Sequence, residues 1–138
     1  MNDKPVRTLR QVVQIPADME SVYQALTDPV IHSAFTGAKA TGEPYAGSVF
    51  TAYNGYITGK IIQLRPGKKI ILAWKTTAWP GGYGPSRLKF TLSPEGSGTR
   101  LVMLQSFVPA DQADGYDKGW HEHYWEPLKA YFLKKAVL

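Results

Sequence analysis

Hydrophobic and polar positions follow two periods along the chain, alternation typical of strands and a three-to-four-residue spacing typical of helices. Residues 8–16 alternate, which predicts a strand. One face of that strand carries Leu9, Gln11, Val13 and Ile15. A helix is predicted over residues 17–29, because acidic residues open this segment and Pro29 closes it. A short helical turn is expected next, over residues 30–35.

The middle of the chain predicts an antiparallel sheet. Five runs rich in Val, Ile, Phe, Tyr and Thr are separated by Asn-Gly, Pro-Gly, Gly-Gly and Glu-Gly turn signals. These runs cover residues 47–53, 56–66, 68–74, 87–94 and 99–109. In the fourth run Leu88, Phe90 and Leu92 share one face, so we expect a sheet with one covered face and one solvated face.

The longest helical pattern covers residues 116–136. At about 100° per residue, one broad stripe holds Trp120, Tyr124, Leu128, Tyr131 and Phe132. Trp125 is expected at the edge of this stripe. Pro127 lacks a backbone donor and is expected to bend the helix near its middle.

Two histidines in this helix, within the sequence GWHEHYWEPL, raise the question of a metal site. His121 and His123 are two residues apart, so on a helix they point in nearly opposite directions and cannot bind one ion. We therefore expect no metal. His121 is expected to project into the apolar stripe near the start of the helix. There it is either a partly buried side chain bonded to a loop or a polar group at a cavity mouth.

Composition and charge narrow the class of protein. The chain has 138 residues, no cysteine and a formal charge of +5, which fits one domain over residues 1–138 without disulfides or thiolate chemistry. The basic residues are spread out and no aromatic-basic motif occurs, so nucleic acid is not an expected partner. No apolar run reaches the length of a membrane span. The first residues lack the features of a secretory signal, and we expect a cytoplasmic protein.

Catalytic motifs are missing from the sequence. The glycine-rich stretch at residues 79–85 is followed by no Lys-Ser or Lys-Thr, so it reads as a hairpin loop with an aromatic residue at each end. No G-x-S-x-G elbow or paired carboxylates can be identified. We expect a non-enzymatic protein without a cofactor, although a tyrosine or His121 beside a cavity could serve as an acid or base.

Four stretches resemble a known family. They are VYQALTDPVIHSAFTG (22–37), GSVFTAYNGYITGKIIQLRPGKKIILAW (47–74), WPGGYGPSRLKFTL (79–92) and VPADQADGYDKGWHEHYWEPLKAYF (108–132). The chain resembles the START-like (SRPBCC, helix-grip) superfamily and, within it, the C-terminal domain of the activator of the heat-shock-protein-90 ATPase. In this family pattern Gly55 suits a tight turn with positive φ, and Gly59 is interpreted as a bulge that curves its strand.

The resemblance implies an α+β helix-grip fold, with a curved antiparallel sheet wrapped around a long C-terminal helix and two short helices after the first strand. It implies a chaperone-binding regulatory module that contacts a heat-shock-protein-90-type chaperone through a basic, sheet-side surface. The alternative is a carrier or sensor of a small apolar ligand in a cavity between sheet and helix. The residues expected along that cavity are Phe35, Phe50, Tyr53, Trp74, Phe90, Met103, Gln105, Trp120, His121 and Tyr124.

Overall fold

A computed structural model of the chain describes residues 4–136. Six antiparallel strands form one sheet in the order β1-β6-β5-β4-β3-β2. Their bounds are β1 Val6–Ile15, β2 Val49–Ala52, β3 Ile57–Arg65, β4 Lys69–Thr76, β5 Ser86–Glu95 and β6 Gly98–Pro109. The helices are α1 Met19–Thr27, α2 Pro29–Thr36, α3 Ala110–Trp120 and α4 Glu126–Ala136, with short turns η1 Tyr53–Gly55 and η2 His121–Trp125.

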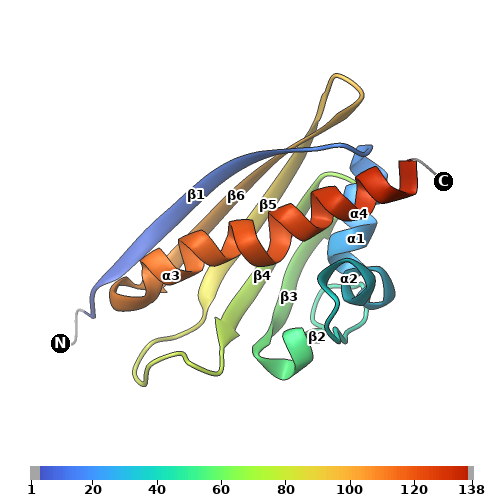
Figure 1. Cartoon of the computed structure of the whole chain (residues 1–138). Coiled ribbons are helices and arrows are strands. Elements are labelled where there is room, and N and C mark those ends of the chain that lie inside the picture. Colours follow the sequence, from blue (N-terminus) through green and yellow to red (C-terminus); the bar gives the residue numbers. More distant parts are fainter. Residues whose placement is uncertain (1–3, 137–138) are drawn as a thin grey trace.

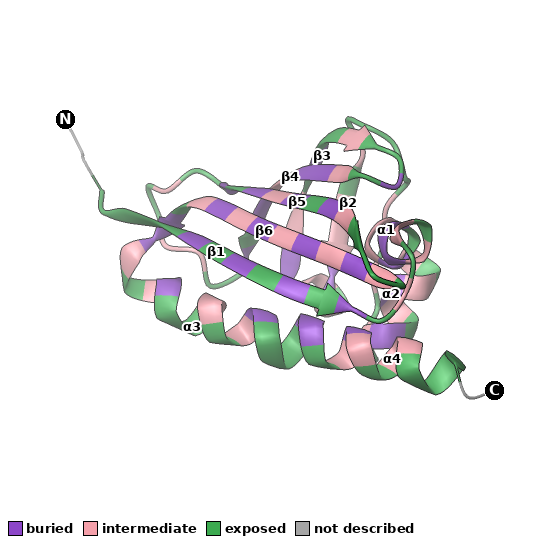
Figure 2. Cartoon of the chain, turned by 90° about the horizontal axis from the view of Figure 1, so that it is seen from above, coloured by how far each residue is buried: buried purple, intermediate pink, exposed green. Residues whose placement is uncertain are grey.

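The C-terminal helical segment, α3 through α4, crosses one face of the curved sheet (Figure 1). Seen from above, sheet and helix form two layers, and α1 and α2 close one end (Figure 2). Along β1, β5 and β6 buried and more exposed residues alternate, with the buried side chains toward the helix. Trp120 and Leu128 are buried on the helix side. The expected helix-grip architecture is therefore confirmed.

Two positions of the β2–β3 hairpin require glycine for different structural reasons. Asn54 and Gly55 both have positive φ, as the turn between the strands requires. Gly59, however, sits in regular pairing with Phe50 and Trp74, and the β-bulge falls later, between Ile61 and Gln63. The bulge prediction for Gly59 is wrong. A Cβ there would lie 1.9 Å from the carbonyl oxygen of the facing strand, so glycine is needed for close backbone approach.

The C-terminal helical segment differs from its prediction in two ways. It begins at Ala110 rather than at residue 116, with Asp111 in its first turn. It is also interrupted by η2, a π-turn in which the Glu126 N–H bonds to the carbonyl of His121, five residues back. Of the helices within residues 4–136, none combines the length and apolarity needed to cross a membrane.

The π-turn accounts for the side of the helix that Trp125 faces. A π-turn inserts one extra residue into the helix, which rotates all later side chains relative to the earlier ones. Trp125, expected at the edge of the apolar stripe, is fully buried as a result. Tyr131 and Phe132, expected within the stripe, are only partly buried.

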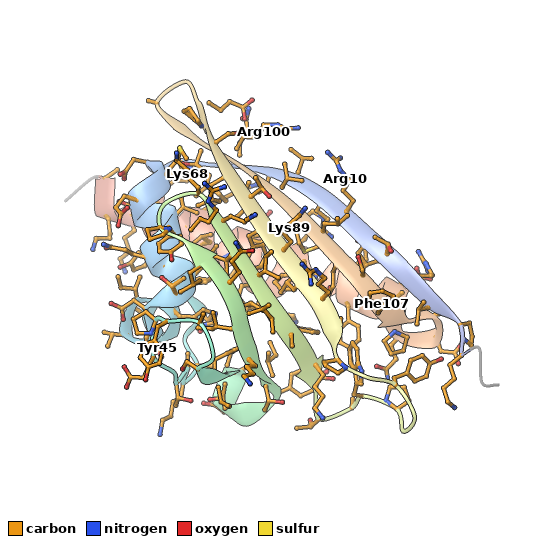
Figure 3. All side chains as sticks on the ribbon, turned by 180° about the vertical axis from the view of Figure 1, so that it is seen from behind. Arg10, Tyr45, Lys68, Lys89, Arg100 and Phe107 are labelled. Atoms are coloured by element: carbon orange, nitrogen blue, oxygen red, sulfur yellow. The ribbon has the colours of Figure 1, made fainter. Side chains whose placement is uncertain are left out.

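The outer face of the sheet is uncovered by any described helix and is basic (Figure 3). Strand register places Leu88, Phe90 and Leu92 inward and the residues between them outward. The outward cations of the strands, called here the basic face, are Arg10, Lys60, Arg65, Lys69, Lys75, Arg87, Lys89 and Arg100. Carboxylates gather instead on the C-terminal helical segment, at Asp111, Asp114, Asp117, Glu122 and Glu126. The same segment also carries Lys118, Lys129, Lys134 and Lys135, so it is nearly neutral while the outer face of the sheet is basic.

Candidate functional site

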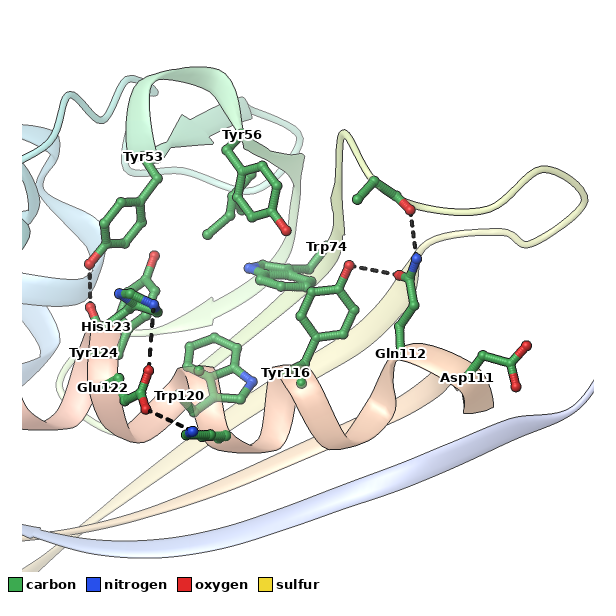
Figure 4. A pocket seen from close by; sticks show the side chains of 15 residues that line it. Tyr53, Tyr56, Trp74, Asp111, Gln112, Tyr116, Trp120, Glu122, His123 and Tyr124 are labelled. Atoms are coloured by element: carbon green, nitrogen blue, oxygen red, sulfur yellow. Dashed lines mark hydrogen bonds and ion pairs between the residues drawn. The ribbon is translucent and has the colours of Figure 1, made fainter.

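An open groove of about 750 Å³ lies between α3 and the strand ends near η1 (Figure 4). Aromatic rings make most of its wall, and only Ile57 and Ala78 contribute aliphatic side chains. The lining aromatic residues are Tyr53, Tyr56, Trp74, Tyr116, Trp120, His123 and Tyr124. This size falls within the range of small-molecule sites in proteins.

Two glycines of α3 lie on the groove side of the helix. Gly115 and Gly119 are four residues apart and therefore share one helical face. A Cβ at Gly115 would meet no atom within 4 Å, and one at Gly119 would only touch the ring of His123 at 3.8 Å. Glycine inside a helix costs about 1 kcal/mol relative to alanine. Open space at both positions shows that packing does not require these glycines.

A hydrogen-bonded chain fixes the groove wall near the start of α3. The Tyr116 hydroxyl is 2.7 Å from Thr76 Oγ1 and donates to Gln112 Oε1 at 2.8 Å. Gln112 Nε2 in turn donates to the Ala78 carbonyl at 2.7 Å. Burial raises the pKa of Tyr116, the bond with Thr76 opposes this rise, and the neighbouring Tyr56 adds to it. Tyr56 and Tyr116 therefore present two phenols to the groove.

Pro127 creates a second polar contact at the other end of the groove. Its missing N–H cannot bond to the carbonyl four residues earlier, that of His123. The Tyr53 hydroxyl donates to this carbonyl instead, and the ring of Tyr53 also packs edge-on against the His123 ring. Burial raises the pKa of Tyr53. The η1 turn is thereby attached to the helix at its π-turn.

Two glutamines of the sheet hold the two tryptophans of the helix. The Trp120 indole donates to Gln105 Oε1 at 2.9 Å, and Gln105 Nε2 donates to Ser86 Oγ at 3.1 Å. The Trp125 indole donates to Gln11 Oε1 at 2.6 Å. All four side chains are buried. Trp120 is consequently held in place as part of the groove wall.

His32 of α2 is buried against the helix beside the groove. Its Nε2 lies 3.1 Å from the Tyr124 hydroxyl, and its Nδ1 has no hydrogen-bond partner. Burial lowers the pKa of His32 to about 4. Burial also raises the pKa of Tyr124, and the nearby Tyr53 adds to that rise. Both side chains are therefore neutral at pH 7.

The ten residues expected along a cavity fall into separate places. Those lining the groove are Tyr53, Trp74, Trp120 and Tyr124. Phe50 and Phe90 border a smaller void of about 60 Å³, which Trp74, Trp120 and Tyr124 also line. Phe35, Met103 and Gln105 line neither space and lie in the core. That any of them binds a ligand remains a prediction.

The position of His121 differs from its prediction. It is exposed and lines neither the groove nor the smaller void. A regular helix would have placed it between Trp120 and Trp125 on the buried face. The π-turn that starts at His121 widens the helix there, so that residues 121–123 all face solvent. The expectation that His121 projects into the apolar stripe is therefore wrong.

Several groove residues were not among those expected, and for Gln112 and Gly115 the reason is that the helix begins earlier than predicted. Tyr56, Gln112, Gly115, Tyr116 and Gly119 all line the groove. A proline followed by an acidic residue, as at Pro109–Asp111, is typical of a helix start. A helix predicted to start at this proline would have placed positions 112, 115, 116 and 119 on a single helical face.

The groups that line the groove are suited to binding. The groove offers ring faces and phenols, and its charged residues lie at the rim. Lys118 and Glu122 pair at 3.6 Å. Of the two histidines near the groove, His32 is buried and neutral, whereas His123 lies at the rim with its Nε2 4.0 Å from Glu122 Oε2. Recognition of a ligand or partner is what this geometry can do.

Comparison with known proteins identifies the family. The model of the family described as "Activator of Hsp90 ATPase homolog 1-like protein" matches residues 16–133. The chain belongs to this family. It is 30% identical over 113 residues to the human "Activator of 90 kDa heat shock protein ATPase homolog 1", covering 82% of this chain and 33% of that protein. A Dictyostelium discoideum homologue is 31% identical, with 72% and 26% covered. The chain thus spans between about a quarter and a third of the length of these activator homologues.

Solved structures share the fold. An HSP90 activator from Plasmodium falciparum superposes with a TM-score of 0.83 at 18% identity, covering 91% of this chain and 95% of that one. An Aha1 protein from Colwellia psychrerythraea, whose solution structure is a dimer, gives 0.76 at 20% identity, with 90% and 95% covered. The human homologue is named as an activator of an ATPase.

The buried His32 leads to a pH-dependent stability. Because its pKa is lower folded than unfolded, the unfolded chain binds more protons between about pH 6.5 and 4. We expect the stabilising contribution to be complete above pH 6.5 and to fall by on the order of 3 kcal/mol as pH drops to 4. Urea unfolding at both pH values measures this loss. His32→Gln keeps a partner for Tyr124 but does not titrate, and parallel pH profiles for variant and wild type would contradict the assignment.

Proposed function

We propose that the chain is a non-catalytic regulatory module that binds a heat-shock-protein-90-type chaperone. The match of the activator family to residues 16–133 is the observation that carries this proposal. The human homologue, by its name, activates the ATPase of a 90 kDa heat-shock protein. The same action is proposed for this chain, which corresponds to about a third of that protein.

The basic face is the surface proposed to contact the chaperone. Arg10 and Lys89 both lie opposite Leu104, and Arg87 lies opposite Ser106, so these cations occupy the two strands that flank β6. None of the ion pairs found within residues 4–136 uses a residue of this face. Unpaired cations on an uncovered sheet suit an acidic partner surface, because complementary charge steers association and fixes its orientation.

Charge reversal tests this surface. We expect the Arg10→Glu/Lys89→Glu variant to bind the chaperone at least tenfold more weakly at low salt and to lose any effect on its ATPase rate. The matched control is Lys134→Glu/Lys135→Glu, which makes the same charge change on α4 and should bind like wild type. Isothermal titration calorimetry and a steady-state ATPase assay measure both. Equal weakening by the two variants would point to net charge rather than this face, and no binding by wild type would overturn the proposal.

A second function, binding of a small apolar ligand, is favoured by the groove. Its aromatic wall suits a planar ring system, since rings stack face-to-face or edge-to-face. The charged residues at its rim are Asp111, Glu122 and Lys118. Lys118 forms an ion pair with Glu122, which leaves Asp111 without a neutralising partner among the described residues of the rim. This balance favours a neutral or positively charged ligand over an anionic one. Tyr56 and Tyr116 could hydrogen-bond an oxygen of such a ligand.

A larger side chain at Gly115 tests whether the groove binds a ligand, without disturbing the core. Leucine at Gly115 would enter open space and is a better helix former than glycine. We expect Gly115→Leu to be at least as stable as wild type and to bind the neutral dye N-phenyl-1-naphthylamine at least tenfold more weakly, as followed by dye fluorescence. Ala130→Leu, at an exposed position of α4, is the control. If wild type fails to bind the dye, or prefers palmitate, the ligand class is wrong.

A further inference from the structure

Phe107 has an unusual backbone for its residue type. It lies near the end of β6 with φ of 63°, in the left-handed region. Strand register explains the position. Arg7 pairs with Val108 and Leu9 with Gln105, so one residue of β1 opposes Ser106 and Phe107 of β6. Phe107 is therefore part of a β-bulge, where glycine would adopt this conformation at the least cost.

The fold gains little from a phenylalanine at this bulge. The side chain is 58% exposed, so most of its ring contacts water rather than the core. Residues 108 and 109 are both buried directly after it, and a glycine at 107 would allow the same change of direction. Phe107 thus combines a strained backbone with an exposed aromatic side chain, and the stability of the fold does not explain this combination. Backbone outliers of this kind often lie at binding sites.

Phe107 lies at the border of the basic face (Figure 3). The residue before it, Ser106, is paired with Arg87 of β5. Two residues earlier on the same outward face, Leu104 is flanked by Arg10 and Lys89 on its two neighbouring strands. An exposed ring next to these cations has the composition of a protein-binding hot spot, in which an aromatic anchor enters a pocket and charged groups surround it.

We infer that Phe107 is the apolar anchor of the basic face, and that its partner presents an apolar pocket bordered by carboxylates. This inference rests on the proposed chaperone binding and names the residue that gives that surface its specificity. The basic face supplies the charge complementarity, and the phenyl ring supplies the buried contact. A protein partner is favoured over nucleic acid because, among the described strands β1, β5 and β6, the exposed ring is that of Phe107, and a series of stacking platforms does not follow it.

Replacement of Phe107 by glycine separates binding from folding. Phe107→Gly removes the ring and relieves the positive φ, so we expect a melting temperature equal to or above that of wild type. The same variant should bind the heat-shock-protein-90-type chaperone at least tenfold more weakly by calorimetry. Leu133→Ala removes a similarly exposed apolar side chain from α4 and serves as the control, with unchanged affinity expected.

The outcomes distinguish this inference from the proposed function. If wild type binds the chaperone and Phe107→Gly binds equally well, the anchor is wrong while the proposed function stands. If wild type does not bind the chaperone, both are overturned. Tighter binding of wild type to a DNA duplex or to phosphatidylserine vesicles than to the chaperone, with the same dependence on Phe107, would also overturn the protein partner.

Discussion

The docking of the C-terminal helix depends on two buried hydrogen bonds between indoles and glutamine amides. Trp120 donates to Gln105 and Trp125 donates to Gln11. An indole has a single donor, and a buried polar group without a partner costs about 1–3 kcal/mol. Each tryptophan must therefore face its own glutamine. These two bonds set both the rotation and the position of the helix along the sheet, which apolar packing alone would leave less defined.

The π-turn follows from this requirement. Trp120 and Trp125 are five residues apart and would point about 140° from each other on a regular helix. Widening the helix between them brings both indoles onto the sheet side, where their rings stack at 5.5 Å between centroids. The proline at 127 lies just after the widened turn, and the carbonyl that it leaves free accepts the bond from Tyr53. One local irregularity thus joins the helix, the sheet and the hairpin that borders the groove.

The two layers present different surfaces to partners. The groove is aromatic with a slightly acidic rim, whereas the opposite side of the sheet is basic and uncovered. A small neutral ligand and an acidic protein could therefore bind at the same time, on opposite sides of one sheet. An effect of ligand binding in the groove on the basic face would have to be transmitted through strands such as β4. This strand carries Trp74 on the groove side and Lys75 on the outer side.

Sequence periodicity predicted the sheet well and the helix less well, for a physical reason. Alternation along β1 and β5 requires no knowledge of the partner strand, and Leu9, Val13, Leu88 and Phe90 are buried as expected. The rotation of the C-terminal helix depends instead on contacts with Gln11 and Gln105, which are distant in sequence. His121 was consequently placed on the wrong side. The groove residues of α3 were missed because a polar first turn, ADQADG, hides a helix whose face is set by tertiary contacts.

A double-mutant cycle between Gln105 and Trp120 tests this account most directly. Gln105→Leu and Trp120→Phe each leave a buried polar group unpaired, while the double variant removes both groups. We expect the losses in unfolding free energy to be non-additive, with a coupling of about 1 kcal/mol or more from urea denaturation. Losses that add to within about 0.3 kcal/mol would contradict the claim that this bond holds the helix in the sheet.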